Sequence, residues 1–145
     1  MTVRPALTAI VVCLLVGGHS THTLAQAGDI YKARLGVVPV DATNQPTISG
    51  SGSVTAVLKG SRLSITGTFA GLQSPATIAR IHVAPKGIRG PSALDLIVTK
   101  ATSGTLQGEV ALTAAQVDHL RRGRLYVQLH SEKAADGNLW GWLLP

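Results

Sequence analysis

The chain has 145 residues, enough for one domain with a single core and too few for a second domain of typical size. Lysine and arginine number 13 against 7 aspartates and glutamates, which gives a formal net charge of +6. The basic residues are scattered, "RRGR" at 121–124 is their only cluster, and no nucleic-acid-binding module is evident, so we expect no nucleic-acid partner. The simpler interpretation is a solvated basic surface that favours acidic polymers of a cell envelope or matrix.

The first 27 residues have the features of a secretory signal peptide. Arg4 provides the positive n-region, residues 6–18 an apolar stretch, and "AQA" at 25–27 a small-x-small cleavage site. The apolar stretch is shorter than the roughly 20 residues of a membrane span, so we expect cleavage, a secreted or periplasmic location and no membrane span afterwards. Residues 28–145 would then form a single domain. Cys13, the only cysteine, lies in the leader, so the mature domain is predicted to contain no disulfide and no cysteine-bound metal.

Short segments with period-two alternation follow, separated by turn residues. Residues 54–69 alternate around Gly60-Ser61, a two-residue turn that favours a β-hairpin. Residues 94–112 form a second predicted hairpin, around Ser103-Gly104. The pattern is typical of an all-β sandwich or barrel.

One segment, "LTAAQVDHLRRGRL" at 112–125, has helical spacing instead. Thr113 and Gln116 fit a capping box, and Gly123 is a stop signal, so the sequence predicts a short helix near residues 114–122. We expect His119 to lie on the exposed side of this helix, without a functional role.

The sequence lacks the motifs of common catalytic sites. There is no G-x-S-x-G elbow, no Walker loop, no dinucleotide fingerprint and no H-E-x-x-H pair, and none of the acidic residues is paired at a spacing suited to acid–base work. The sequence therefore predicts a protein that is not an enzyme.

Three strand-like segments place polar and aromatic side chains on the face opposite the core. In "ARIHVA", "LYVQLH" and "NLWGWLL" the aliphatic residues alternate inward, which leaves the larger polar and aromatic side chains outward. Aromatic residues make up only 3% of the chain, so their concentration on outward positions is a distinctive feature. The candidate ligand-binding residues are Arg80, His82, Tyr126, His130, Trp140 and Trp142.

Several interpretations of these six residues remain open. They could form a secondary apolar cluster beneath a loop such as 84–93 or 131–137, or against the helix, with each histidine hydrogen-bonded to a loop carbonyl. They could instead form a ligand surface on which aromatic faces stack against a sugar, a peptide or another flat group. A third interpretation is a copper or zinc site at His82 and His130, although two imidazoles fall short of the three protein ligands usual for catalytic zinc. A purely structural envelope protein without a ligand is the fourth.

In order and spacing, "GLQSPATIARIHVAPKGIRGP" followed by "GTLQGEVALTAAQVDHLRRGRLYVQLHSEKAADGNLWGWL" resembles the CHRD domain, named for chordin and found in secreted bacterial proteins. The resemblance covers about residues 52–144. His82 matches the second histidine of the family's A-H-I-H motif, whereas Arg80 stands in place of the first. The other matching positions are Leu120, Gly123, Tyr126, Val127, His130, Ser131, Gly137, Gly141 and Leu143.

This resemblance implies an antiparallel β-sandwich of immunoglobulin-like or Greek-key type that acts as a secreted, non-catalytic binding or interaction module without a cofactor. Its partner would be a protein, glycan or small ligand of the envelope or the extracellular space. The signalling ligands of chordin itself are not carried over to so short a chain. Asn138 and Trp140 also replace charged residues of the family's last motif, which weakens any metal or ion-pair role that needs those charges.

Overall fold

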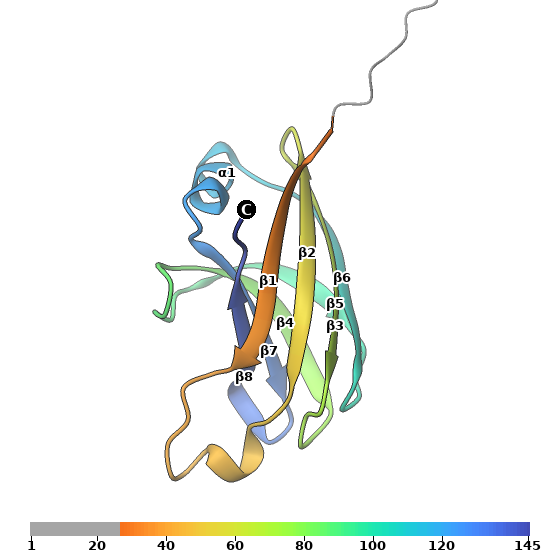
Figure 1. Ribbon diagram of the computed structural model, residues 1–145, viewed down its shortest axis with the longest axis vertical. Coiled ribbons are helices and arrows are strands. Elements are labelled where there is room, and N and C mark those ends of the chain that lie inside the picture. Colours follow the sequence, from red (N-terminus) through yellow and green to blue (C-terminus); the bar gives the residue numbers. More distant parts are fainter. Residues whose placement is uncertain (1–26) are drawn as a thin grey trace, which may run out of the picture.

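A computed structural model describes residues 27–145, and the predicted leader, apart from Ala27, lies outside the described residues (Figure 1). None of the helices in the described part is long and apolar enough to cross a membrane. The elements in chain order are β1 (Asp29–Val37), the 3-10 helix η1 (Gln45–Thr47), β2 (Ser51–Lys59), β3 (Arg62–Ala70), β4 (Ala76–Val83), β5 (Ser92–Val98), β6 (Gly104–Ala111), α1 (Ala114–Arg121), β7 (Leu125–Ser131) and β8 (Ala134–Trp142).

The strands form a closed antiparallel barrel in the order β1-β2-β3-β6-β5-β4-β7-β8. The predicted all-β class with one short helix is therefore confirmed, whereas the predicted immunoglobulin-like or Greek-key β-sandwich is wrong. Two short ladders close the barrel: β1 pairs with β8 at Gly36↔Trp140, and β5 pairs with β6 at Val98↔Leu106. Period-two alternation gives one buried and one outer face in a sandwich and in a barrel alike, so it could not reveal this closure.

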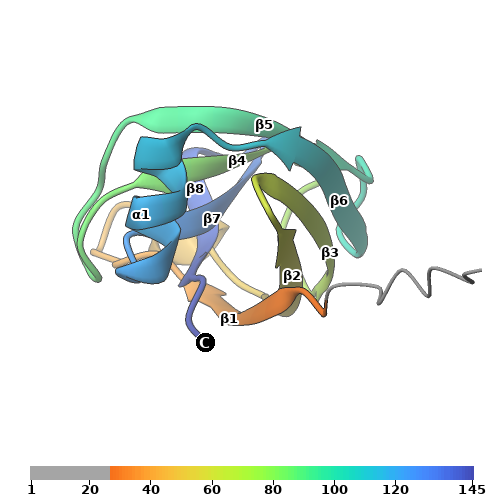
Figure 2. The ribbon, with the colours of Figure 1, turned by 90° about the horizontal axis from the view of Figure 1, so that it is seen from above.

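Aliphatic side chains from all sides fill the barrel interior, which is viewed along its axis in Figure 2. Ile65 of β3, Ile81 of β4, Leu129 of β7 and Leu139 of β8 are each at most 1% exposed. Eight strands enclose a space that side chains can fill, so this interior is a packed core and not a channel.

Both predicted hairpins are present. β2 and β3 pair from Lys59↔Arg62 onward across the two-residue turn, in which Gly60 has a φ of +61°. β5 and β6 are joined through residues 99–103 and pair at Val98↔Leu106.

The predicted helix is also present, as α1, and its capping box is formed. The Gln116 backbone N–H donates to Thr113 Oγ1 at 3.2 Å, and the Thr113 N–H donates to Gln116 Oε1 at 2.8 Å. The expected exposure of His119 is wrong, because its ring is half-buried and its Nδ1 atom is shielded from solvent without a hydrogen-bond partner in the described part of the chain.

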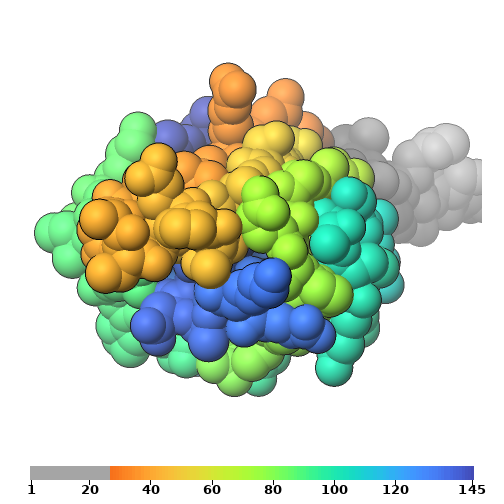
Figure 3. Space-filling model, turned by 90° about the horizontal axis from the view of Figure 1, so that it is seen from below, coloured from red at the N-terminus to blue at the C-terminus, as the bar shows by residue number. Residues whose placement is uncertain are grey.

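Loops cover the end of the barrel that is lowest in Figure 1 and faces the viewer in Figure 3. There the loop 38–50, orange to yellow, lies beside the blue turn between β7 and β8. Val38, Ile48 and Ala134 form a small buried cluster against which Trp140 packs. Trp140 is thereby held on one side by a loop that joins β1 to β2.

Candidate functional site

The six sequence-predicted site residues lie together on the outer face of β4, β7 and β8. The alternation prediction is confirmed in all three strands: Ile81, Val127 and Leu139 are fully buried in the barrel core, and their neighbours in sequence point outward. The strands are adjacent in the barrel, with His82 paired to Tyr126 and Tyr126 paired to Trp142. β4 and the consecutive strands β7 and β8, which are distant from β4 in sequence, therefore contribute to one surface.

Aromatic rings on this face are in mutual contact. The His82 ring stacks on Tyr126 with centroids 5.0 Å apart, and Tyr126 lies 4.6 Å from Trp142. Trp140 meets Trp142 edge to face at 4.8 Å. We call His82, Tyr126, Trp140 and Trp142 the outer aromatic cluster. Contacts of this geometry add about 0.5–1.5 kcal/mol per pair beyond the burial of the rings.

The loop between β4 and β5 covers most of this cluster. Trp142 Nε1–H donates to the carbonyl of Ala84 at 3.0 Å, and the Gly90 N–H donates to the Tyr126 hydroxyl at 3.0 Å. Tyr126 is fully buried, and Trp142 and His82 are 8% and 9% exposed. These three rings have no free face on which a ligand could stack, so they form a secondary core beneath the loop.

The remaining three members of the predicted set are half-buried. Arg80 Nε donates to Asp95 Oδ1 at 2.7 Å across the β4–β5 pair, and Asp95 is largely exposed. An ion pair in so open a position contributes at most about 1 kcal/mol. Arg80 therefore links two strands and adds little to the stability of the fold.

His130 is held by the turn that follows it. Its Nδ1 lies 2.8 Å from the carbonyl oxygen of Ala135. Burial lowers the pKa of His130 below its ordinary value, and the hydrogen bond to Ala135 opposes the shift. Positive charge on the neighbouring His82, Arg80 and Arg89 acts in the same direction as burial. The folded protein therefore favours the neutral ring.

We expect the protein to lose stability in mild acid because of His130. A folded-state pKa below the unfolded value means that the unfolded chain binds the proton first, so stability falls as pH drops through about 6.5 toward the lowered pKa. The test compares melting temperatures near pH 7.5 and pH 5 with a chelator present, for the wild-type chain and for His130→Asn. Asparagine keeps an N–H donor for Ala135 and does not titrate, so this variant should show the smaller decrease; an equal decrease would contradict the assignment.

The sequence did not predict a groove that lies next to the outer aromatic cluster. It has a volume of about 360 Å³, and its floor crosses the β1–β8 junction at Gly36 and Gly141. Three exposed cations line it, and among the described residues none of the three forms an ion pair. The sequence feature that indicates part of this groove is the period-two spacing of Lys32 and Arg34, which puts both on the outer face of β1. The lining residues are Lys32, Arg34, Gly36, Lys86, Trp140, Gly141, Trp142 and Leu144.

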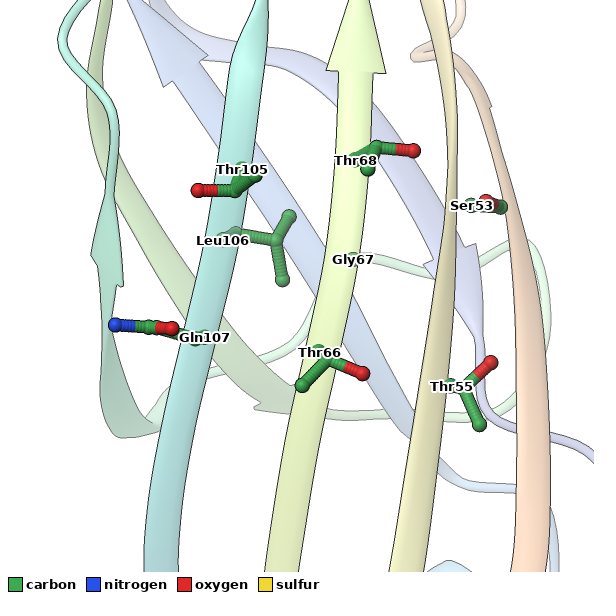
Figure 4. Close-up of a pocket in the computed structure, with 8 residues that line it drawn as sticks. All are labelled: Ser53, Thr55, Thr66, Gly67, Thr68, Thr105, Leu106 and Gln107. Atoms are coloured by element: carbon green, nitrogen blue, oxygen red, sulfur yellow. The ribbon is translucent and has the colours of Figure 1, made fainter.

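A second hollow lies on the outer face of β2, β3 and β6. Figure 4 shows threonine and serine hydroxyls along these strands, and the hollow measures about 390 Å³. Its lining contains no ionisable side chain, so it offers neither a charge nor a metal ligand of the usual kinds. The lining residues are Ser53, Thr55, Thr66, Gly67, Thr68, Thr105, Leu106 and Gln107.

Comparison with known proteins identifies the family. The CHRD domain matches residues 32–143, which is most of the chain. The chain belongs to the CHRD domain family. The match begins within β1, ahead of the residues 52–144 on which the resemblance rested, so the basic strand of the groove lies inside the CHRD domain. No curated protein and no solved structure matches the chain.

Positions that carry the CHRD resemblance have clear structural roles in the barrel. Val127 and Leu143 lie in the core, and Tyr126 and His130 bind backbone groups of the covering loop and of the following turn. Arg80 stands where the family's first motif has its leading histidine, and it donates a hydrogen bond to Asp95. His82 is therefore the only histidine of that motif in this chain.

Proposed function

We propose that this CHRD domain is a small secreted or periplasmic protein of bacterial type that binds an acidic polysaccharide of the envelope or extracellular space without catalysis. The observation that carries the proposal is the groove beside the outer aromatic cluster, where Lys32, Arg34 and Lys86 surround the partly exposed Trp140. Cations without ion-pair partners are available to carboxylates or sulfates, and an indole ring packs against the apolar face of a sugar.

Backbone geometry keeps this groove open. A Cβ built at Gly36 has no heavy atom within 4 Å, so this position leaves space in the floor between the cations and the tryptophans. Gly36 pairs with Trp140 across the β1–β8 ladder, and Arg34 and Lys32 lie one and two steps from Gly36 along the same outer face. A polymer lying across this ladder would contact charge on one side and aromatic surface on the other.

The test is binding of oligogalacturonate, an acidic sugar polymer, with neutral maltodextrin as the comparison. We expect the wild-type chain to bind oligogalacturonate more tightly than maltodextrin, and more tightly at low salt than at high salt. Dissolved ions weaken the attraction between exposed charges, which decays over about 10 Å at 0.1 M salt. The triple variant Lys32→Gln, Arg34→Gln, Lys86→Gln should lose most of this affinity while melting near the wild-type temperature, since all three side chains are exposed.

The matched control removes three exposed cations that do not line the groove: Lys59→Gln, Lys100→Gln and Arg121→Gln. Both variants change the net charge equally. Equal loss of affinity in both would indicate general charge attraction and overturn the assignment to the groove. Absence of binding by the wild-type chain would favour the structural envelope interpretation, and preference for an acidic peptide over the polysaccharide would change the class of partner.

A further inference from the structure

The rings of His82 and His130 approach each other on the outer face although their strand positions are distant. His82 is paired with Tyr126 and His130 with Ile78, so one outward position on each strand separates the two histidines along the β4–β7 pair. Their ring centroids are nevertheless only 6.3 Å apart, with the planes inclined by 34°. The two side chains therefore lean toward each other along the strands.

The side chains between them are drawn away to opposite sides. Arg80 and Gln128 are paired at the intervening position. Arg80 is bonded to Asp95 on β5, and Gln128 Nε2 donates to the Asp136 carbonyl on β8 at 2.9 Å. Because β5 and β8 flank the β4–β7 pair on its two sides, neither side chain is anchored between the imidazoles.

One nitrogen of each ring has a backbone partner and the other has none. His82 Nδ1 lies 2.9 Å from the Gly90 carbonyl oxygen, and His130 Nδ1 lies 2.8 Å from that of Ala135. A carbonyl only accepts, so in the neutral ring Nδ1 carries the hydrogen and Nε2 the lone pair. Both Nε2 atoms are shielded from solvent and have no hydrogen-bond partner among the described residues. An imidazole oriented through Nδ1 by a carbonyl, with Nε2 unused, is the usual state of a metal-binding histidine.

We propose that His82 and His130 bind one copper(I) ion through their two Nε2 atoms. In a collinear arrangement, the distance between the two ring centroids is the sum of two metal–nitrogen bonds of about 2 Å each and the two distances from Nε2 to the ring centroid, which together make roughly 6 Å. This length matches the 6.3 Å between the ring centroids. A tetrahedral angle between the two ligands would bring the centroids closer together.

Copper(I) fits this pair better than a divalent ion. No group of three or more histidine, cysteine, aspartate or glutamate side chains within residues 27–145 is placed to hold a metal, whereas zinc normally takes four ligands, at least three of them from the protein. Copper(I) is a soft monovalent ion that is stable with two collinear nitrogen donors. Arg80 and Arg89 lie close enough to influence His130, and their positive charges penalise a divalent ion more than a monovalent one.

The test uses protein produced from the full-length sequence without a histidine tag. Copper(I) is supplied under anaerobic conditions with ascorbate, and its affinity is measured by competition with bicinchoninate. We expect one copper per chain, a higher melting temperature with copper bound, and an X-ray absorption spectrum that shows two nitrogen neighbours at about 2 Å.

Two asparagine variants separate metal binding from structure. His82→Asn and His130→Asn each keep an N–H donor for the backbone carbonyl and remove the Nε2 lone pair, so each should abolish stoichiometric copper binding. His130→Asn should melt near the wild-type temperature, whereas His82→Asn also loses its stacking on Tyr126 and should melt lower while remaining folded. His119→Gln is the matched control and should bind like the wild-type chain. Copper retained by both asparagine variants, or zinc bound more tightly than copper(I) by the wild-type chain, would overturn the proposal. Failure of polysaccharide binding would leave it unaffected, because neither histidine lines the groove.

Discussion

Replacing Trp142 with alanine is expected to lower the free energy of unfolding by about 3–5 kcal/mol, the range found when a buried tryptophan is truncated. The ring is 8% exposed and packs against Tyr126 and Trp140, so its removal leaves a cavity beneath the covering loop. The Ala84 carbonyl also loses the indole N–H that donates to it. Chemical unfolding followed by circular dichroism measures the effect.

Two further variants distinguish the contributions of Trp142. Trp142→Phe keeps an aromatic ring and removes the indole N–H, so it should cost less, about 1–3 kcal/mol for an unsatisfied buried carbonyl and some lost packing. Trp140→Ala should also cost less, because Trp140 is only partly buried and lines the groove, and it should weaken sugar binding instead. If Trp142→Ala has the same midpoint of chemical unfolding as the wild-type chain, Trp142 does not belong to a secondary core.

Gly90→Ala should destabilise the protein by about 2–3 kcal/mol, as overpacking does at close-packed sites. A Cβ at Gly90 would lie 2.0 Å from the carbonyl oxygen of Val83 and 2.8 Å from the Ala84 side chain, so the loop must move. This movement would disturb two hydrogen bonds at once, because Gly90 donates to the Tyr126 hydroxyl and accepts from His82. The near-ultraviolet circular dichroism of the aromatic cluster should weaken along with the stability.

Gly36→Ala is the matched control for Gly90→Ala. The two substitutions add the same methyl group, and at Gly36 it meets no atom within 4 Å. We expect a change in unfolding free energy within about 0.5 kcal/mol, as for other surface substitutions. If both alanine variants unfold alike, the close approach of Gly90 to β4 does not restrain the loop.

Strand alternation predicted the outer set of side chains because a strand reverses the direction of its side chains at every residue. Ile81, Val127 and Leu139 had to face the core, so their neighbours in sequence had to face away from it. Alternation does not say which strands are adjacent, and the meeting of β4 with β7 and β8 depends on the β4–β7 pairing between segments distant in sequence. It also could not show that a loop buries Tyr126, because an outward direction implies exposure only where nothing packs above it.

The missed features depend on tertiary pairing. Lys32 and Arg34 are two of many scattered basic residues in the sequence, and they come to line a groove with Trp140 only when β1 pairs with β8. The sandwich prediction failed at the same place, since the ladder that closes the barrel brings these residues together. The local elements were predictable because capping and turn chemistry are encoded by adjacent residues such as Thr113 and Gln116.

The β1–β8 ladder also constrains when the protein can fold. Gly36 and Val37 pair with Trp140 and Leu139, so the first described strand remains without one of its neighbours until the last strand is available. Contacts between such distant residues must overcome the entropy of closing a long loop, which makes folding slow compared with helical proteins of this size. Barrel closure, and with it the groove, is therefore a late event that requires the chain from β1 to β8 to be available.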